Sequence, residues 1–263
     1  MGWMTLLDVV TAIGQVMLNL SLAPDIYNVH RRKSTGEMTA LPLVSMLVNC
    51  HVWLLYGILR NSIFPVAVTQ GFGELVAFVC NIIYFRWSTP EERKGLIKLY
   101  LMALPFYCAL TVFFVLSEAN VTSQTHHDAS TVLGYVGVII NVCLFVSPLA
   151  RLKHVIETKS AASIPINLSL MMFVSSVLWV ATGLLDSDYF ITGLNVAGVV
   201  LGAIQMVLYY NYRPKRGIQD QEDIEANGRM SDVHGPVKGS LNTAVSSPIA
   251  PYKQIASPIV VTA

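Results

Sequence analysis

Seven apolar runs, each long enough to cross a lipid bilayer as a helix, dominate this sequence of 263 residues. A transmembrane helix needs about 20 mostly apolar residues. The runs that reach this length are 5–29, 41–60, 64–86, 97–117, 131–151, 164–186 and 189–212. Charged residues make up 13% of the chain and fall almost entirely between the runs, whereas a soluble domain carries about a quarter. We therefore expect an all-α membrane protein with seven transmembrane helices.

Net charge, cysteines and histidines argue against several other classes of protein. The net charge of +1 lacks the basic excess of a nucleic-acid-binding domain. The four cysteines lie far apart without a CxxC pair, which argues against a zinc site or a disulfide framework. His126 and His127 are too few for a metal site, and His51 has no carboxylate or second histidine at ligand spacing. We expect no metal, no cofactor and no nucleic-acid partner, and interpret His51 as a packing residue.

The basic residues indicate how the chain is oriented in the membrane. Clusters of lysine and arginine follow spans one, three, five and seven, whereas Arg60 stands alone on the other side. The positive-inside rule then places the N-terminus outside and the C-terminus in the cytosol. Asn120 begins an Asn-Val-Thr glycosylation sequon after span four, on the side that this topology places outside. We expect a multi-pass protein surrounded by lipid in the plasma membrane, with the Golgi or vacuolar membrane as alternatives.

The two halves of the chain repeat each other. Spans one to three and five to seven share five landmarks at offsets of 124 to 126 residues. These are Ala23-Pro24 and Ser147-Pro148, Lys33-Ser34 and Lys159-Ser160, Trp53-x3-Gly57 and Trp179-x3-Gly183, Gln70-x2-Gly73 and Asn195-x2-Gly198, and Tyr84 and Tyr209. Three spans leave the chain on the opposite side of the membrane, and the unpaired span four brings it back. Both copies therefore begin on the same side and are expected to be parallel. Substrate sites in transporters with such repeats lie near the midplane, between the repeats.

This pattern divides the chain into four parts. The first three-helix repeat takes residues 1–90, the linker helix and outer loop 91–128, and the second three-helix repeat 129–212. Residues 213–263 open with an acidic cluster and continue with Ser, Pro, Gly and Asn, which cannot bury enough apolar surface to fold alone. We expect a disordered cytosolic tail, and leave phosphorylation at its two Ser-Pro pairs as an alternative to a plain linker.

Several short motifs resemble those of the SWEET (MtN3/saliva-type) sugar transporters. They are Ala23-Pro24, Lys33-Ser34 to Pro42, Asn49-Cys50 to Trp53, Tyr56 and Gly57, then Ser147-Pro148-Leu149, Thr158-Lys159-Ser160 to Pro165, Leu168-Ser169-Leu170, Trp179, Asn195, Gly198 and Gly202. The resemblance covers residues 5–213, and SWEETs are themselves an example of parallel repeats. It implies a 3+1+3 fold and a facilitative, bidirectional uniporter that moves a mono- or disaccharide down its gradient by alternating access.

Four prolines lie at corresponding ends of spans one, two, five and six: Pro24, Pro42, Pro148 and Pro165. A proline inside a helix removes one backbone hydrogen bond and clashes with the preceding turn. The four prolines either cap helix ends or act as hinges. The resemblance implies hinges, because the matching prolines of SWEETs form a tetrad that lets the helices bend during gating.

Two tryptophans and two amides are candidates for binding a sugar. Trp53 and Trp179 lie deep in spans two and six, although tryptophan is enriched at membrane interfaces. Their rings fit the apolar C–H face of a sugar, or pack between helices. Gln70 and Asn195 offer donors and acceptors to hydroxyls, or link neighbouring helices.

The resemblance favours a pocket, because SWEETs bind sugar with aromatic residues and a pair of asparagines from spans three and seven. Gln70 departs from this pair by one methylene, which leaves the choice of sugar open. Two tryptophans in a pocket leave limited space and favour a glucose-like hexose over sucrose.

Three further polar residues are candidates for a role in transport. Glu74 lies near the middle of span three, where an ionisable residue is by default a functional candidate. We interpret it as a pocket-wall or structural residue, with proton coupling as the alternative. Tyr56 and Asp188 match residues that close the outer gate of SWEETs by hydrogen bonding, although Asp188 also fits a solvated turn.

Other functions fit the sequence less well. A seven-helix receptor does not need two copies around an unpaired helix. A PQ-loop transporter of another solute keeps glutamine after the proline, where this chain has Asp25 and Leu149. GxSxG, HExxH and paired intramembrane aspartates are absent, so no enzyme is expected, and a GxxxxGK[ST] motif for nucleotide is absent too. The PQ-loop transporter and a proton-coupled carrier stay as alternatives, and the oligomeric state, including a homo-oligomer, is open.

Overall fold

The computed structural model describes residues 2–36, 38–121, 124–161, 164 and 166–212. Every regular element in these ranges is helical. The elements are α1 (Gly2–Asn19), α2 (Ala23–Arg32), α3 (Leu41–Leu59), η1 (Ile63–Ala67), α4 (Val68–Trp87), α5 (Pro90–Glu118), α6 (His126–Thr158), α7 (Ile166–Leu185) and α8 (Tyr189–Tyr212). With α1–α2 and η1–α4 taken as one span each, seven helices in the described chain are long and apolar enough to cross a membrane. The expected seven-helix fold is confirmed.

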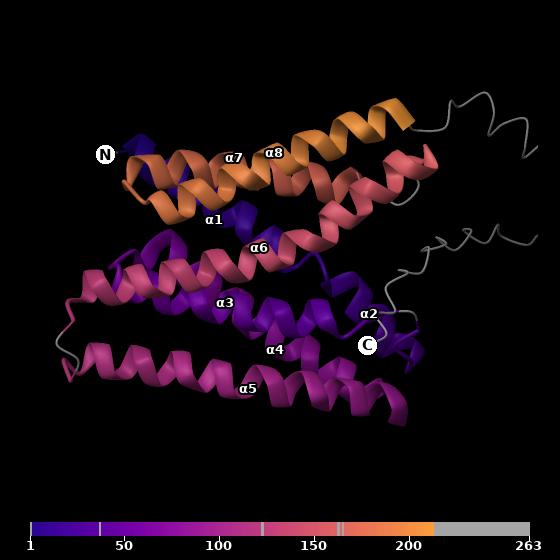
Figure 1. Ribbon diagram of the computed structural model, residues 1–263, viewed down its shortest axis with the longest axis horizontal. Coiled ribbons are helices and arrows are strands. Elements are labelled where there is room, and N and C mark those ends of the chain that lie inside the picture. The colour runs from indigo at the N-terminus through magenta and orange to yellow at the C-terminus, as the bar shows by residue number, and fades with distance from the viewer. Residues whose placement is uncertain (1, 37, 122–123, 162–163, 165, 213–263) are drawn as a thin grey trace, which may run out of the picture.

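The helices form two units that run in the same direction. In the first repeat, α4 packs against α1, α2 and α3, and in the second repeat, α8 packs against α6 and α7. The repeats meet where α1 contacts α7 and where α3 contacts α6. Both α1 and α6 start at the same end of the bundle (Figure 1). The expected pair of parallel three-helix repeats is therefore present.

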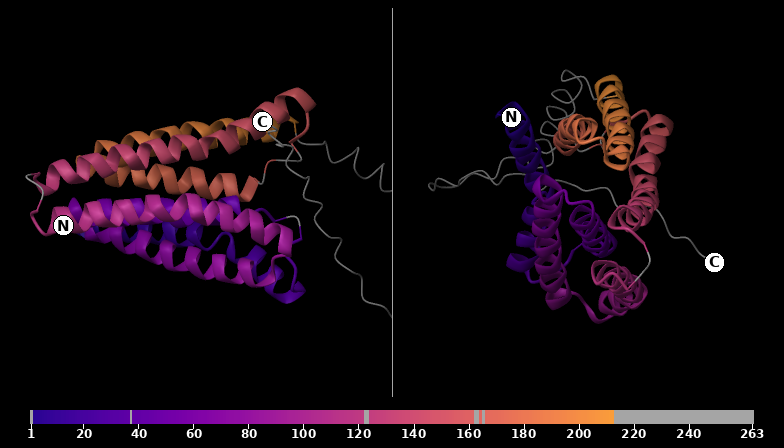
Figure 2. Two further views of the ribbon diagram at one scale, coloured as in Figure 1. Left: turned by 60° about the horizontal axis from the view of Figure 1, so that its bottom comes forward. Right: turned by 90° about the vertical axis from the view of Figure 1, so that its left-hand side faces the viewer.

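The unpaired helix α5 belongs to one side of this arrangement. It packs mainly against α3 and has few contacts with α6, which follows it in the chain. Seen end-on in Figure 2, α5 lies on the side of the first repeat that faces away from α7 and α8. Large apolar side chains such as Leu101 and Met102 are exposed along α5, as expected for a surface that contacts lipid.

The two ends of the bundle carry different connections. One end holds the start of α1, the α5–α6 connection and the α7–α8 turn, and we call it the Asp188 end (Figure 1). The opposite end, called the Lys33 end, holds α2 and the C-terminal ends of α6 and α8. Lys33 and Lys159 end α2 and α6 with the same left-handed backbone, with φ of 54° at both. The Lys-Ser landmarks of the sequence therefore mark the same helix-ending turn in each repeat.

The prolines take different places in their helices. Span one is broken between Asn19 and Ala23, and Pro24 lies in the first turn of α2. Pro42 likewise lies in the first turn of α3, where a missing N–H leaves no bond unmade. Pro148 stands inside α6 and removes one hydrogen bond from a continuous helix. Pro165 lies outside the described residues, as do Thr122 of the sequon and the whole of the predicted tail.

Candidate functional site

A buried carboxylate joins the two repeats at the Asp188 end. The Tyr56 hydroxyl on α3 donates to Asp188 Oδ2 at 2.7 Å, and Arg60 Nε lies 2.9 Å from the same oxygen. Asp188 Oδ1 accepts the backbone N–H groups of Phe190 and Ile191 at 3.1 Å, which caps the start of α8. The structure thus places Tyr56 and Asp188 together, and Asp188 is buried rather than part of a solvated turn.

The surroundings of this carboxylate match its charge. Tyr56 is fully buried and Asp188 is 3% exposed. Burying a charge is costly unless a partner and hydrogen bonds offset the loss of water. Here a guanidinium, a phenol and two backbone amides share the two oxygens. The contact is therefore strong only while the repeats stay together at this end.

An aromatic layer lies beneath the Tyr56–Asp188 contact. Trp53, Tyr56 and Trp179 belong to one buried cluster, with Phe190 packed against it. Trp53 and Tyr56 meet edge to face, with ring centroids 5.2 Å apart. On its other side, the Trp53 ring covers Gly137 of α6, where a Cβ would lie 2.9 Å from ring atom Cζ2. The two predicted tryptophans are thus brought into one layer between the repeats.

Trp179 starts a chain of polar contacts that the sequence analysis missed. Its indole N–H donates to Gln15 Oε1 at 2.9 Å, and Gln15 Nε2 donates to Asn19 Oδ1 at 3.0 Å. Asn19 Nδ2 then donates to the carbonyl of Thr69 at 3.0 Å. The available signal was a pair of amides four residues apart in an otherwise apolar run, since such pairs share a helix face.

The two predicted amides, Gln70 and Asn195, are not used to join helices. Asn195 Nδ2 donates to the carbonyl of Ile191 in its own helix, at 2.8 Å. Gln70 Oε1 is buried and accepts no hydrogen bond from the described residues. A buried acceptor without a partner costs about 1–3 kcal/mol. The Gln70 amide therefore has an unused acceptor that a hydroxyl-bearing ligand can satisfy.

A glycine follows each of these amides and brings its helix close to a neighbour. A Cβ on Gly73 would lie 2.8 Å from Cys50 Sγ, and a Cβ on Gly198 would lie 2.6 Å from Ser176 Oγ. Cβ atoms essentially never approach that closely. The repeated amide-x2-glycine pattern thus combines a polar side chain with the close approach of two helices in both repeats.

Glu74 lies in a different environment from Gln70. Its Oε1 contacts His51 Nδ1 at 3.0 Å and accepts the hydroxyl of Tyr107 on α5. His51 Nε2 lies 2.9 Å from Thr111 Oγ1, and the His51 ring stacks on Tyr107. His51, interpreted from sequence as a packing residue, therefore has a carboxylate partner. The two residues lie 23 positions apart in different spans, so ligand spacing along one helix did not reveal the pair.

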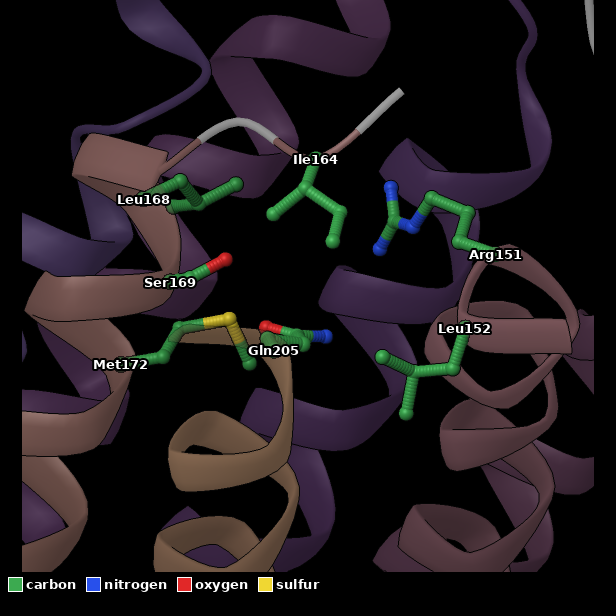
Figure 3. Close-up of a pocket in the computed structure, with 7 residues that line it drawn as sticks. All are labelled: Arg151, Leu152, Ile164, Leu168, Ser169, Met172 and Gln205. Carbon is green, nitrogen blue, oxygen red and sulfur yellow. The ribbon is translucent and has the colours of Figure 1, made fainter. Parts of the chain in front are cut away.

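The structure has cavities at both ends of the bundle. At the Lys33 end, the Arg151 guanidinium and the Gln205 amide point into a pocket between α6, α7 and α8 (Figure 3). Its space of about 10 Å³ admits one water molecule and excludes a sugar. At the Asp188 end, a cavity of about 380 Å³ lies beside Arg60 and Asp188.

Two parallel three-helix repeats and an unpaired helix, with Trp53 and Trp179 in one buried cluster between the repeats, have the arrangement of a multi-pass membrane transporter. The chain belongs to the MtN3_slv family, described as "sugar efflux transporter for intercellular exchange", whose model matches residues 5–92 and 131–217. Each matched range contains one three-helix repeat. Since the members of this family are transporters, the expectation that the chain is not an enzyme is confirmed.

Relatives and a solved structure agree with this family. The chain is 31% identical to the bidirectional sugar transporter SWEET3 of Arabidopsis thaliana, over 72% of each chain. It is 29% identical to SWEET4 of the same plant, over 87% of this chain and 89% of the relative. A eukaryotic SWEET transporter solved at 3.7 Å matches 80% of this chain and 96% of its own length, at 26% identity and a TM-score of 0.67.

Proposed function

We propose that the chain is a facilitative sugar uniporter that moves a mono- or disaccharide in either direction by alternating access of its two repeats. The names of its relatives support a sugar as substrate. The observation that carries the proposal is the buried Gln70 oxygen without a partner, at the position equivalent to Asn195. Together with Trp53 and Trp179, these amides offer both the polar and the apolar contacts that a sugar ring needs.

In this proposal the Asp188 end faces outside and the Lys33 end faces the cytosol, in the plasma membrane. The clusters of Lys and Arg at the Lys33 end support this orientation. Tyr56, Arg60 and Asp188 then form a closed outer gate. Opening it requires Asp188 to leave Tyr56 and Arg60 while the α1–α7 and α3–α6 contacts rearrange. Pro148 is the hinge best placed to bend a helix, because it interrupts the hydrogen bonds of a continuous one.

The contacts of Glu74 support transport that is not coupled to protons. Its Oε1 is held by His51 and Tyr107, on α3 and α5, rather than by groups of the second repeat. A coupling residue has to be exposed to each side of the membrane in turn. We assign Glu74 a structural role and take a hexose as the preferred substrate, because the tryptophan layer is tightly packed.

The decisive experiment is uptake of labelled glucose and sucrose by cells that lack their own carriers. Wild type is compared with Asn195→Ala, Gln70→Leu and Trp179→Ala, after surface expression has been measured for each. We expect glucose uptake by wild type and about a tenfold or larger loss in the variants. Leu101→Ala, at an exposed position of α5, is the control and should transport normally. Absence of uptake of any sugar by well-expressed wild type contradicts the proposal.

A further inference from the structure

The cavity at the Asp188 end adjoins the contact between Tyr56 and Asp188, because Arg60 and Asp188 line it. Its volume of about 380 Å³ falls in the range of about 300–1,000 Å³ that is typical of small-molecule sites. The residues that line it come from the end of α3, the following connection, the start of η1, the start of α6 and the α7–α8 turn. They are Leu59, Arg60, Asn61, Ser62, Phe64, His127, Ser130, Asp186 and Asp188. Both repeats therefore contribute to it.

The cavity has the mixed chemistry that a sugar requires. The Phe64 ring is 46% exposed and offers an apolar plate to the C–H face of a pyranose. Arg60 and Asn61 supply hydrogen-bond donors, and Asp186 supplies acceptors for a pair of neighbouring hydroxyls. Asp186 is exposed to solvent, and the Arg60 guanidinium acts on its carboxylate. Both the carboxylate and the Phe64 side chain are therefore open to a ligand that reaches this end of the bundle.

Charge narrows the class of ligand. Asp186 and Asp188 outnumber Arg60 among the ionised groups of the lining, and Asp8 on α1 adds a further negative charge that acts on Asp186. Burial and the nearby Asp8 and Asp188 raise the pKa of Asp186, with Arg60 acting in the opposite direction. An anionic ligand such as a sugar phosphate is repelled here, whereas a neutral polyol is accepted.

We propose that this cavity is an outer recognition site, which binds a neutral sugar while the adjoining gate is closed. The inference rests on the proposed function, since it assigns a second sugar site to the same pathway. A hydroxyl bound beside Asp188 and Arg60 competes for the atoms that hold Tyr56 in place. A ligand that interacts better with the open arrangement shifts the gate toward it. Sugar on the outside therefore promotes its own entry.

The test is equilibrium binding of labelled glucose to the purified full-length protein. In the double variant Trp179→Ala/Asn195→Ala, which removes the central contacts, we expect one sugar to stay bound per chain. Adding Phe64→Ala or Asp186→Asn should weaken this binding about tenfold, equivalent to about 1.4 kcal/mol. Tyr189→Ala is the matched control, because this aromatic residue is 82% exposed at the same end but does not line the cavity. Its effect should be nil.

Two results would overturn the outer site. One is that the double variant binds no glucose, and the other is that its remaining binding is unchanged by both Phe64→Ala and Asp186→Asn. If the double variant does not fold, the single variant Phe64→Trp places a fluorophore in the cavity. Glucose should change the tryptophan fluorescence of this variant more than it changes that of wild type. Equal changes in the two proteins would also overturn the site. In either case, sugar uptake by wild type still supports the proposed function, whereas failure of wild-type uptake rejects that function separately.

Discussion

The first and second repeats share a backbone plan but place equivalent residues in different surroundings. His51 and Glu74 of the first repeat correspond to Val177 and Val199 of the second, by the offsets of the sequence landmarks. The His51–Glu74 pair occurs where α5 covers the first repeat, and its other partners, Tyr107 and Thr111, come from α5. This polar contact is thus tied to the attachment of the unpaired helix rather than to the contact between the repeats.

Further contacts attach α5 to the first repeat alone. Tyr100 of α5 donates to Asn81 on α4, and Thr35 donates to Glu92 in the first turn of α5. Both repeats pack through their small residues, but only the first has a fourth helix that can satisfy polar side chains on its outer face. The described contacts therefore attach α5 mainly to the first repeat.

The turns that close span two and span six provide a second comparison. Ser62 N–H donates to the Gly57 carbonyl, and Asp188 N–H donates to the Gly183 carbonyl, after a left-handed residue in each case. The backbone is therefore repeated, but Ser62 stands in the first repeat where Asp188 stands in the second. One substitution on a shared turn makes the contact that closes the Asp188 end.

The largest effect is expected from breaking the contacts of Glu74 with His51 and Tyr107 in the first repeat. Glu74→Ala leaves His51 and Tyr107 without the acceptor that they share and should lower the free energy of unfolding by about 3 kcal/mol. Val199→Ala at the equivalent position should cost about 1 kcal/mol, because it removes only apolar contacts. Thermal unfolding of the purified protein in detergent measures both. Equal losses in the two variants would show that the repeats do not differ in this way.

The next effect concerns the repeated turn. Asp188→Ser gives the second repeat the residue of the first and removes the carboxylate that contacts Tyr56 and Arg60, while the serine hydroxyl can still cap the start of α8. The Asp188 end should open more often, so a cysteine placed at Ile191 should react about tenfold faster with a membrane-impermeant thiol reagent. The native cysteines are replaced beforehand. Ser62→Ala serves as the control, and equal reaction rates would remove Asp188 from the gate.

A moderate effect is expected at the hydrogen bond between Trp179 and Gln15. Trp179→Phe leaves Gln15 Oε1 without its donor and should cost about 1–2 kcal/mol of unfolding free energy. Gln15→Leu alone breaks this bond and also the bond from Gln15 Nε2 to Asn19 Oδ1, so the double variant should lose less than the sum of the two single losses. The two single variants and the double variant, followed by thermal unfolding, form a double-mutant cycle. Strict additivity would mean that the hydrogen bond contributes nothing.

The smallest effect is a dependence of stability on pH. Burial, Asp8 and Asp188 raise the pKa of Asp186 above its ordinary value. A raised pKa means that the protonated form is favoured in the folded state. Stability from this group is therefore fully present below the ordinary pKa and is lost as the pH rises through the folded value. Asp186→Asn should raise the unfolding temperature slightly at pH 7 and change nothing at pH 3, whereas an identical difference at both pH values contradicts the shift.

Sequence reasoning succeeded where a property is local or repeated. The apolar runs predicted the spans, and the offset between Trp53 and Trp179 predicted two parallel repeats. It did not find the His51–Glu74 pair or the Gln15–Trp179 hydrogen bond, because each joins different spans. It also treated Pro24, Pro42 and Pro148 alike, although only Pro148 interrupts a helix.

The number of membrane-spanning helices, their division into two parallel units and the unusual polar and aromatic residues within them can all be predicted from the amino-acid sequence. The reason is that a bilayer offers no partner to backbone groups, so every long apolar run must satisfy its own hydrogen bonds as a helix. The contacts that each of these side chains makes, by contrast, depend on how the helices are packed together. The rotation of each helix about its axis depends on the helices packed against it. In α4 this rotation points Glu74 toward α5 and leaves Gln70 Oε1 without a hydrogen-bond partner among the described residues.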